Sequence, residues 1–330
     1  MHRWILDGQR QHAGASGELS VLLTSLATAC KAVSSAVRRA GLTTGLLGAS
    51  SASNATGDVQ QALDVVSNTV FLNLLKGSGA CAAVVSEEEE DIVLGDSAAH
   101  YLVATDPLDG SSNIACNVSV GSIFAVLRRA PAAVGSPAAA SEFLRPGREL
   151  VAAGYAAYGS STQLLLALAG GAPPALFTLD PAVGEFLLTT PRVVIPAAPQ
   201  RIYSVNEGNA GAFPPHLAAF LAECKAGPKP YSARYVGSMV ADIHRTLLYG
   251  GVYVYPPTPS APKGKLRLLY EVAPMAFIVE AAGGKATAGG GARVLDVAPA
   301  GVHDKAPVTI GCARDVDRLE ELRAAAERAA

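Results

Sequence analysis

The sequence is short of charged and aromatic side chains. Charged residues make up 16% of the 330 residues, against about 25% in an average globular protein, and aromatic residues make up 6%. The formal net charge is −2, which excludes a broadly basic nucleic-acid-binding protein. If the protein binds an anion, it must therefore do so with a few locally placed cations.

Closely spaced cysteines and long apolar runs are also missing. The five cysteines lie far apart and show no Cys-x-x-Cys spacing, which favours reduced thiols over a disulfide framework or a zinc site. No stretch approaches the roughly 18 to 20 apolar residues that span a bilayer. The first residues lack the apolar segment of a secretory signal. We therefore expect a soluble intracellular protein that binds neither membrane nor nucleic acid.

The length and the apolar content predict two domains with large cores. Half of the residues are hydrophobic, which is ample material for burial, and a chain of this length divides into about two domains. The weakest break in composition, over residues 191–199, places an N-terminal domain at 1–193 and a C-terminal domain at 194–330.

Hydrophobic periodicity predicts alternating helices and strands. Expected helices cover 17–39, 58–75, 214–224, 238–249, 266–282 (kinked at Pro274) and 314–330. Expected strands cover 81–85, 101–105, 123–128, 150–158, 163–168, 185–189, 201–205 and 252–255. The small residues over 42–56 predict a mobile loop. Such alternation is typical of an α/β or α+β protein built in layers.

The segment from Asp106 to Ser112, Asp-Pro-Leu-Asp-Gly-Ser-Ser, carries the sharpest chemical signal. Two aspartates three residues apart follow a predicted strand, so both can point into a crevice at its carboxyl end. With no histidine or cysteine beside them, such carboxylates favour Mg²⁺ or Mn²⁺ over Zn²⁺. The glycine and serines that follow offer donors to phosphate oxygens. A simple turn with a capping aspartate is the alternative, and the pattern alone leaves it open.

Further acidic residues fit this interpretation to different degrees. Glu87 and Glu88 leave the end of another predicted strand, although a run of glutamates is usually a solvated turn. Glu271 lies in a strongly apolar helix, where an unpaired carboxylate is costly to bury, so we expect it to meet a cation or a metal. From spacing alone, Asp58 and Asp64 are surface residues of their helix.

Taken together, these motifs resemble the fructose-1,6-bisphosphatase family, within the lithium-sensitive, magnesium-dependent sugar and inositol phosphatases. The resemblance runs from about Gly17 to the end of the chain. The segments that carry it are 54–58, 86–88, 106–114, 150–155, 204–208, 234–242 and 264–271. The aspartate loop marks the superfamily only, whereas 234–242 and 264–271 are far more specific to this family.

The resemblance implies a five-layer α-β-α-β-α sandwich and a homotetramer that hydrolyses the 1-phosphate of fructose 1,6-bisphosphate. Two or more Mg²⁺ ions, with Mn²⁺ as a substitute, would serve each site. The implied metal ligands are Glu87, Glu88, Asp106, the backbone carbonyl of Leu108, Asp109 and Glu271. Asp64, paired with Glu88, would take the proton of the attacking water, and Asp58 would help to position metals and water.

The resemblance also implies substrate and effector sites. Gly110, Ser111 and Ser112 would surround the phosphoryl group. The sugar and its 6-phosphate would be held by Asn206, Tyr235, Tyr255, Lys265 and, from a neighbouring subunit, Arg234. An AMP site is partly matched by Glu18, Ser20, Tyr101 and Arg128, but His100 stands where a lysine is expected.

Some departures from the family pattern leave alternatives open. Asn209 replaces a tyrosine that helps to bind the 6-phosphate in animal enzymes, and Ala115 replaces an aspartate. A sedoheptulose-1,7-bisphosphatase, or an enzyme acting on both sugars, shares the metal loops, although segment 236–244 favours the fructose enzyme. A non-catalytic ligand-sensing scaffold would have lost the carboxylates, which are present. We expect a cytoplasmic protein of gluconeogenesis or sucrose synthesis, or else a plastid-stroma form of the Calvin cycle.

Overall fold

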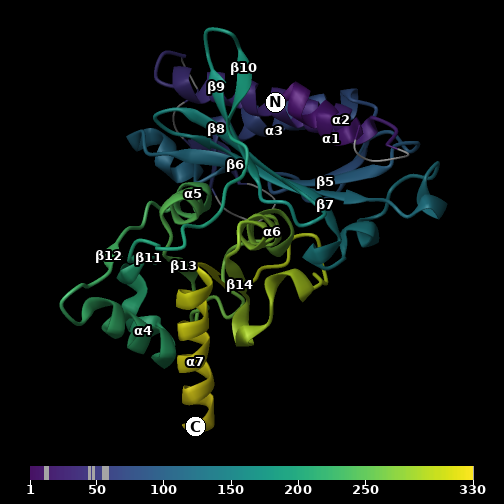
Figure 1. Ribbon diagram of the computed structural model, residues 1–330. Coiled ribbons are helices and arrows are strands. Elements are labelled where there is room, and N and C mark those ends of the chain that lie inside the picture. The colour runs from purple at the N-terminus through teal and green to yellow at the C-terminus, as the bar shows by residue number, and fades with distance from the viewer. Residues whose placement is uncertain (11–14, 44–45, 47–48, 54–58, 330) are drawn as a thin grey trace.

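The structure, a computed structural model, describes residues 1–10, 15–43, 46, 49–53 and 59–329. Its helices and sheets stack in five layers of the α-β-α-β-α type, as the family resemblance implied (Figure 1). Asp58 and part of the loop expected over 42–56 lie outside the described residues.

The first two layers come from the N-terminal half. Its helices are α1 (His2–Arg10), α2 (Glu18–Arg39) and α3 (Ala62–Gly77), and they cover one face of an eight-stranded sheet (Figure 1). The strands of this sheet are β3 (Cys81–Ser86), β4 (Val93–Leu94), β5 (Tyr101–Asp109), β6 (Val120–Arg128), β7 (Leu150–Tyr158), β8 (Thr162–Leu168), β9 (Ala175–Asp180) and β10 (Glu185–Thr190). A separate antiparallel pair is formed by β1 (Ala49–Ser53) and β2 (Val59–Gln61).

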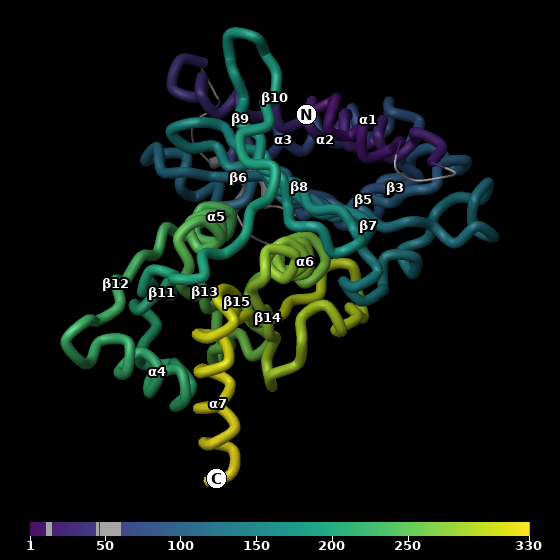
Figure 2. The backbone as a smooth tube through the Cα atoms, viewed as in Figure 1, coloured from purple at the N-terminus to yellow at the C-terminus, as the bar shows by residue number. Residues whose placement is uncertain are grey.

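The other three layers come from the C-terminal half. Helices α5 (Met239–Tyr249) and α6 (Ala273–Ala281) lie between the large sheet and a five-stranded sheet, and α4 (Pro215–Lys225) and α7 (Ala313–Ala329) lie beyond that sheet (Figure 2). The five strands are β11 (Ile202–Ser204), β12 (Ser232–Ala233), β13 (Val252–Tyr255), β14 (Lys285–Thr287) and β15 (Val308–Gly311). The main core is thus the shared packing of α5 and α6 against both sheets.

One strand pairing of the large sheet matters for the site. Its strands follow the order β10-β9-β8-β7-β6-β5-β3-β4. Strands β3 and β5 run parallel, whereas β3 pairs antiparallel with β4 and β5 antiparallel with β6. The carboxyl ends of β3 and β5 therefore meet at the same edge of the sheet, where the Glu87 N–H donates to the Thr105 carbonyl at 3.2 Å.

Several elements differ from the sequence prediction. The helix expected over 266–282 begins as a π-helix, Leu268–Val272, and only then becomes α6, so Pro274 sits in the first turn of α6 rather than at a kink. The fixed φ of a proline suits the first turn of an α-helix. Helix α3 begins at Ala62 rather than at 58. Strand β9 was not expected.

Helix α2 corrects the expectation about membrane-length runs. An 18-residue window of it has a mean hydropathy of 1.4, so it is long and apolar enough to cross a membrane. However, 44% of that window is buried inside the protein, and Leu22, Leu26 and Val33 are fully buried in the core cluster that also includes α3. Core helices pass the same test as membrane spans, so α2 by itself is weak evidence for a membrane.

Candidate active site

Carboxylates that are distant in sequence gather at the edge where β3 and β5 end. Oxygens of Asp106, Asp109 and Glu271 lie within 4.8 Å of one another, although Glu271 comes from the π-helix. All three are buried. They line a cavity of about 410 Å³ together with Gln61, Asp64, Glu87, Glu88, Leu108, Gly110, Ser111 and Ser112. The predicted convergence of these acids is therefore present.

The loop between the two aspartates is held by hydrogen bonds from both sides. The register of β5 against β6 shifts between Asp106 and Asp109, so the two side chains leave the regular alternation of the strand. The Leu108 N–H donates to Asp106 Oδ1 at 3.0 Å. The Ser122 hydroxyl, on the neighbouring strand, donates to the Pro107 carbonyl at 2.6 Å. The aspartates are thus fixed before any ligand binds.

Asp109 and Glu271 are each held by donors of a helix start. Asp109 accepts from the Ser238 hydroxyl at 2.5 Å and from the N–H groups of Met239 and Val240 at 3.1 and 2.8 Å, all at the start of α5. Glu271 Oε2 accepts from the Arg267 N–H at 2.6 Å, within the same turn of the π-helix. A π-helix often marks a functional site, and here it holds Glu271 toward the cavity.

The electrostatics of this cluster indicate a place for a cation. Burial, and then the charge of Glu87, raises the pKa of both Asp106 and Glu271 well above the usual range. Burial raises the pKa of Glu87 to about 7, although the Arg267 guanidinium, 3.3 Å from Glu87 Oε1, lowers it. Buried acids that repel one another ionise together only when a cation compensates them. Oxygen-only donors fit Mg²⁺ or Mn²⁺, so the residues present fit such an ion.

Asp64 lies across the same cavity and was wrongly placed at the surface by its spacing. It stands in the first turn of α3 and is only 3% exposed. Its Oδ2 accepts from the Gln61 N–H at 2.7 Å, and its buried Oδ1 has no hydrogen-bond partner among the described residues. Burial raises the pKa of Asp64 to about 6. A carboxylate with this pKa and an open oxygen is suited to take a proton at neutral pH.

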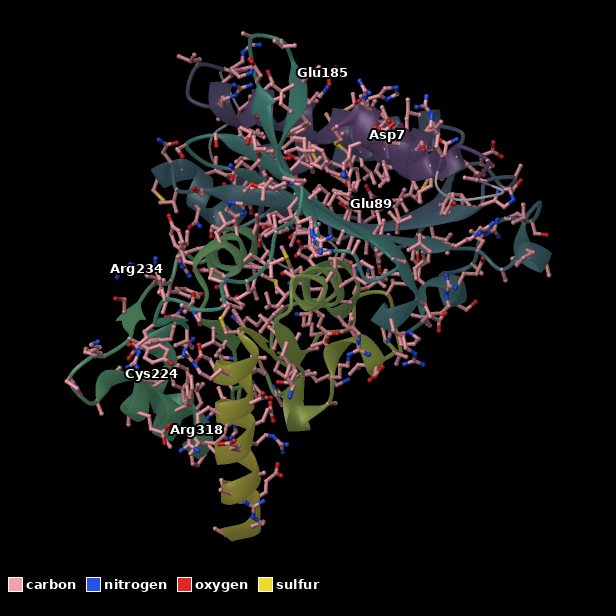
Figure 3. All side chains as sticks on the ribbon, in the orientation of Figure 1. Asp7, Glu89, Glu185, Cys224, Arg234 and Arg318 are labelled. Atoms are coloured by element: carbon pink, nitrogen blue, oxygen red, sulfur yellow. The ribbon has the colours of Figure 1, made fainter. Side chains whose placement is uncertain are left out.

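A second set of hollows extends from the carboxylates toward β13. A cavity of about 650 Å³ is lined by Asp109, Tyr235, Tyr255, Lys265 and their neighbours. It adjoins one of about 290 Å³ that shares Tyr255 and Lys265 and adds Asn206 and Asn209. The structure thus brings together the predicted substrate residues other than Arg234, whose exposed side chain projects at the edge of the protein (Figure 3).

Two cations of this region were not identified as site residues from the sequence. Arg267 is only 7% exposed and contacts Glu87. Lys305 lines the larger cavity because its backbone forms a bridge with Arg267. The apolar residues around Arg267 were a signal that it is buried. Lys305 has no such signal, because only the fold brings it to the site.

Three of the four residues matched to an AMP site line a separate cavity of about 380 Å³. Ser20, Tyr101 and Arg128 line it, together with residues of α1 and of the start of α2. Glu18 is not among the lining residues. Its carboxylate instead accepts from the His100 N–H and contacts His100 Nδ1, both at 2.6 Å.

Comparison with known proteins identifies the family. The family model described as fructose-1-6-bisphosphatase, N-terminal domain, matches residues 1–191, and the corresponding C-terminal domain matches residues 195–324. The chain belongs to the fructose-1,6-bisphosphatase family. Fructose-1,6-bisphosphatase of Kluyveromyces lactis is 47% identical, covering 96% of this chain and 92% of that protein. Fructose-1,6-bisphosphatase 1 of Bos taurus is also 47% identical, covering 97% and 94%.

Solved structures of the fructose-1,6-bisphosphatase family have the same fold. The Leishmania major fructose-1,6-bisphosphatase in holo form matches with a TM-score of 0.90 at 43% identity, and 98% of each chain is covered. The resemblance derived from the sequence motifs and the layered fold that it implied are therefore confirmed. The acidic cluster at the meeting of β3, β5 and the π-helix is where a fructose-1,6-bisphosphatase fold of this chain can hold metal.

Proposed function

We propose that this chain hydrolyses the 1-phosphate of fructose 1,6-bisphosphate, giving fructose 6-phosphate and inorganic phosphate, with Mg²⁺ as its cofactor. The observation that carries the proposal is the buried carboxylate cluster beside a cavity that leads to Lys265. An acidic centre and a distant lysine suit a substrate with two phosphates, one to be cleaved and one to be held.

The metal ligands of the proposal are Glu87, Glu88, Asp106, the Leu108 carbonyl, Asp109 and Glu271, all of which line one cavity. Bound there, two or more Mg²⁺ ions would neutralise phosphoryl charge, lower the pKa of water and stabilise the leaving oxygen. Asp64, paired with Glu88, takes the proton of the attacking water. Gly110, Ser111 and Ser112, on the same cavity wall, orient the phosphoryl group. The role proposed for Asp58 falls outside the described residues.

The sugar and its 6-phosphate would be held at the far end of the hollow. Lys265 supplies a charge-assisted bond to phosphate, and Asn206, Tyr235 and Tyr255 supply neutral hydrogen bonds. Arg234 is exposed, and its guanidinium donates to the neighbouring Ala233 carbonyl. This exposure supports the proposal that Arg234 reaches the active site of a neighbouring subunit in a homotetramer.

Release of inorganic phosphate tests the catalytic proposal. With fructose 1,6-bisphosphate, we expect release in the presence of Mg²⁺ and a loss of at least about 10³-fold when Mg²⁺ is removed by a chelator, because charge stabilisation by the metal accounts for several kcal/mol. Sedoheptulose 1,7-bisphosphate is the comparison substrate, and faster release from it would favour the alternative enzyme. No release from either sugar would favour the ligand-sensing scaffold and contradict the proposal.

The cavity beside α1 and α2 supports AMP as a regulatory ligand. Tyr101 and Arg128 both line it, and an arginine suits a phosphate monoester. We expect AMP to lower activity and Arg128→Ala to weaken AMP binding at least about tenfold, because a hydrogen bond to a charged group contributes about 1.5 to 3 kcal/mol. Titration calorimetry measures this, with exposed Arg39→Ala as the matched control. Equal AMP binding by the two variants would contradict the assignment.

A cytoplasmic location is proposed together with the activity. Relatives from Oryza sativa, 45% identical over 98% of this chain, are named cytosolic fructose-1,6-bisphosphatases. The plastid stroma is the alternative, and cell fractionation of the native protein distinguishes the two compartments.

A further inference from the structure

We propose that Ser238 is the positioning residue of the metal site. Its hydroxyl fixes the orientation of Asp109, so that one defined carboxylate oxygen is presented to the cavity. Asp242, on the helix that Ser238 caps, holds the loop that carries Tyr235. This inference rests on the proposed function in one respect, namely that a divalent cation occupies the carboxylate cluster.

The first argument counts the acceptor positions of Asp109. Each carboxylate oxygen offers about two lone pairs. Oδ2 accepts from the Ser238 hydroxyl at 2.5 Å and from the Val240 N–H at 2.8 Å, which occupies both of its lone pairs. Among the described residues, Oδ1 accepts only from the Met239 N–H at 3.1 Å. Oδ1 is therefore the oxygen with a lone pair left for a cation.

The second argument concerns the serine itself. Ser238 is fully buried and is the N-cap of α5, where its Oγ accepts from the Ala241 N–H at 3.3 Å. A hydroxyl has a single hydrogen to donate, and here that hydrogen goes to Asp109. The hydroxyl thus accepts a hydrogen bond to cap the helix and donates one to orient the carboxylate. The hydroxyl can therefore make the bond to Asp109 and the bond from the Ala241 N–H at the same time.

Close packing fixes the place of the serine. Gly110 follows Asp109 with a φ of 75°, and a Cβ atom at this position would lie 2.7 Å from the Ser238 Cβ. Only glycine permits this approach, because a Cβ contact under 3.0 Å forces one backbone to shift. Ser238 and the aspartate loop are therefore in direct contact, and neither moves independently of the other.

The third argument concerns the loop before Ser238. Asp242 is fully buried, and its carboxylate accepts from the N–H groups of Val236 and Gly237 at 3.0 and 3.1 Å. It also accepts from the Ser204 hydroxyl at 2.8 Å and from the Arg245 guanidinium at 2.7 Å. Asp242 thus fixes the loop that carries Tyr235 to the first turn of α5. The metal site and the sugar side of the cavity consequently share one support.

The test compares Mn²⁺ binding by the full-length chain and two variants, measured by electron paramagnetic resonance without substrate. We expect Ser238→Ala to weaken Mn²⁺ binding ten- to a hundredfold, as residues that orient metal ligands typically do. Ile243→Val is the matched control, because Ile243 is fully buried on the same helix, whereas the donors to Asp109 are Ser238, Met239 and Val240. It should lower the melting temperature of the protein but change Mn²⁺ affinity by less than about twofold.

Ser238→Gly separates capping from orientation. Glycine retains most of the N-cap preference of serine but has no hydroxyl, so we expect it to bind Mn²⁺ as weakly as Ser238→Ala. If Ser238→Gly and Ser238→Ala both bind Mn²⁺ as tightly as Ile243→Val, Ser238 does not position Asp109. Circular dichroism of each variant shows whether it is folded.

The outcomes also separate this inference from the catalytic proposal. Mn²⁺ binding that depends on Ser238 in a chain that releases no phosphate supports the positioning role and rejects the catalytic one. Phosphate release with Mn²⁺ affinity that is independent of Ser238 does the reverse. In an active enzyme, Ser238→Ala should also raise the KM for the sugar bisphosphate, whereas Ile243→Val should not. A chain that binds no Mn²⁺ at all overturns both.

Discussion

Asp106→Asn is expected to reduce kcat/KM for phosphate release by at least about 10³-fold, which corresponds to about 4 kcal/mol of transition-state stabilisation. Asp106 stands at the centre of the buried cluster, within 4.8 Å of oxygens of Asp109 and Glu271. An amide removes the negative charge that a divalent cation requires from this ligand. The fold should persist, because the asparagine oxygen can still accept from the Leu108 N–H.

Asp106→Asn should lower activity but raise the stability of the metal-free protein. The unfolded chain ionises Asp106 near pH 4, whereas the folded chain keeps it protonated to higher pH because burial raises its pKa. The contribution of Asp106 to the stability of the metal-free protein therefore falls as pH rises above about 4, and Asp106→Asn removes this loss. We expect the variant to melt at or above the temperature of the unchanged protein at pH 7.5 in a chelator.

The control for this experiment is Asp91→Asn. Asp91 is exposed in the acidic turn that follows β3, so its replacement changes the net charge equally but leaves the cluster intact. Activity of this variant should stay within about twofold of the unchanged protein, since surface substitutions have small effects. Substantial turnover by Asp106→Asn under the same conditions would refute the metal assignment.

Asp64→Asn is expected to lower kcat by about 10² to 10⁴, the usual contribution of a general base. The reason is the open Oδ1 of Asp64, which is buried without a partner among the described residues. Affinity for Mn²⁺ should change by less than about tenfold, because Asp64 acts on water and is not a proposed ligand. Stopped-flow or coupled phosphate assays at saturating Mg²⁺ measure kcat directly.

The dependence of activity on pH is an independent test of the role of Asp64. A general base works in its ionised form, so activity should fall as pH drops through its pKa, which burial raises to about 6. Asp64→Asn should lose that acid limb along with most of its rate. If the variant keeps more than a tenth of the normal kcat, or keeps the same acid limb, another group takes the proton.

The sequence predicted the parts of the site that carry local signals. Asp106 and Asp109 lie at the end of the apolar strand β5, and Gly110 marks the close approach to Ser238 that the fold requires. Glu271 was noticed because a carboxylate in an apolar helix needs a partner. Each of these inferences depends on residues that are near one another in the chain, where burial and turn chemistry leave a readable pattern.

Features that arise from tertiary packing were beyond the sequence. Spacing alone placed Asp64 at the surface, whereas the packing of α3 on the sheet buries it. The π-helix before α6 was read as regular helix, since the apolar residues around Glu271 fit either form. Lys305 reaches the cavity through a backbone bridge to Arg267, a pairing of residues 38 positions apart by their numbers.

The short strand β4 determines at which edge of the sheet the acidic residues lie. Between β3 and β5 the chain turns back through β4, which pairs antiparallel with β3, and so re-enters the sheet in the direction of β3. Had β5 run antiparallel to β3, Asp106 and Asp109 would lie at the opposite edge of the sheet from Glu87, about 20 Å away for a strand of six residues. The connection over residues 87–100, of which only Val93 and Leu94 pair with β3, thus brings the acidic residues of both strands to one edge without a loop across the face of the sheet.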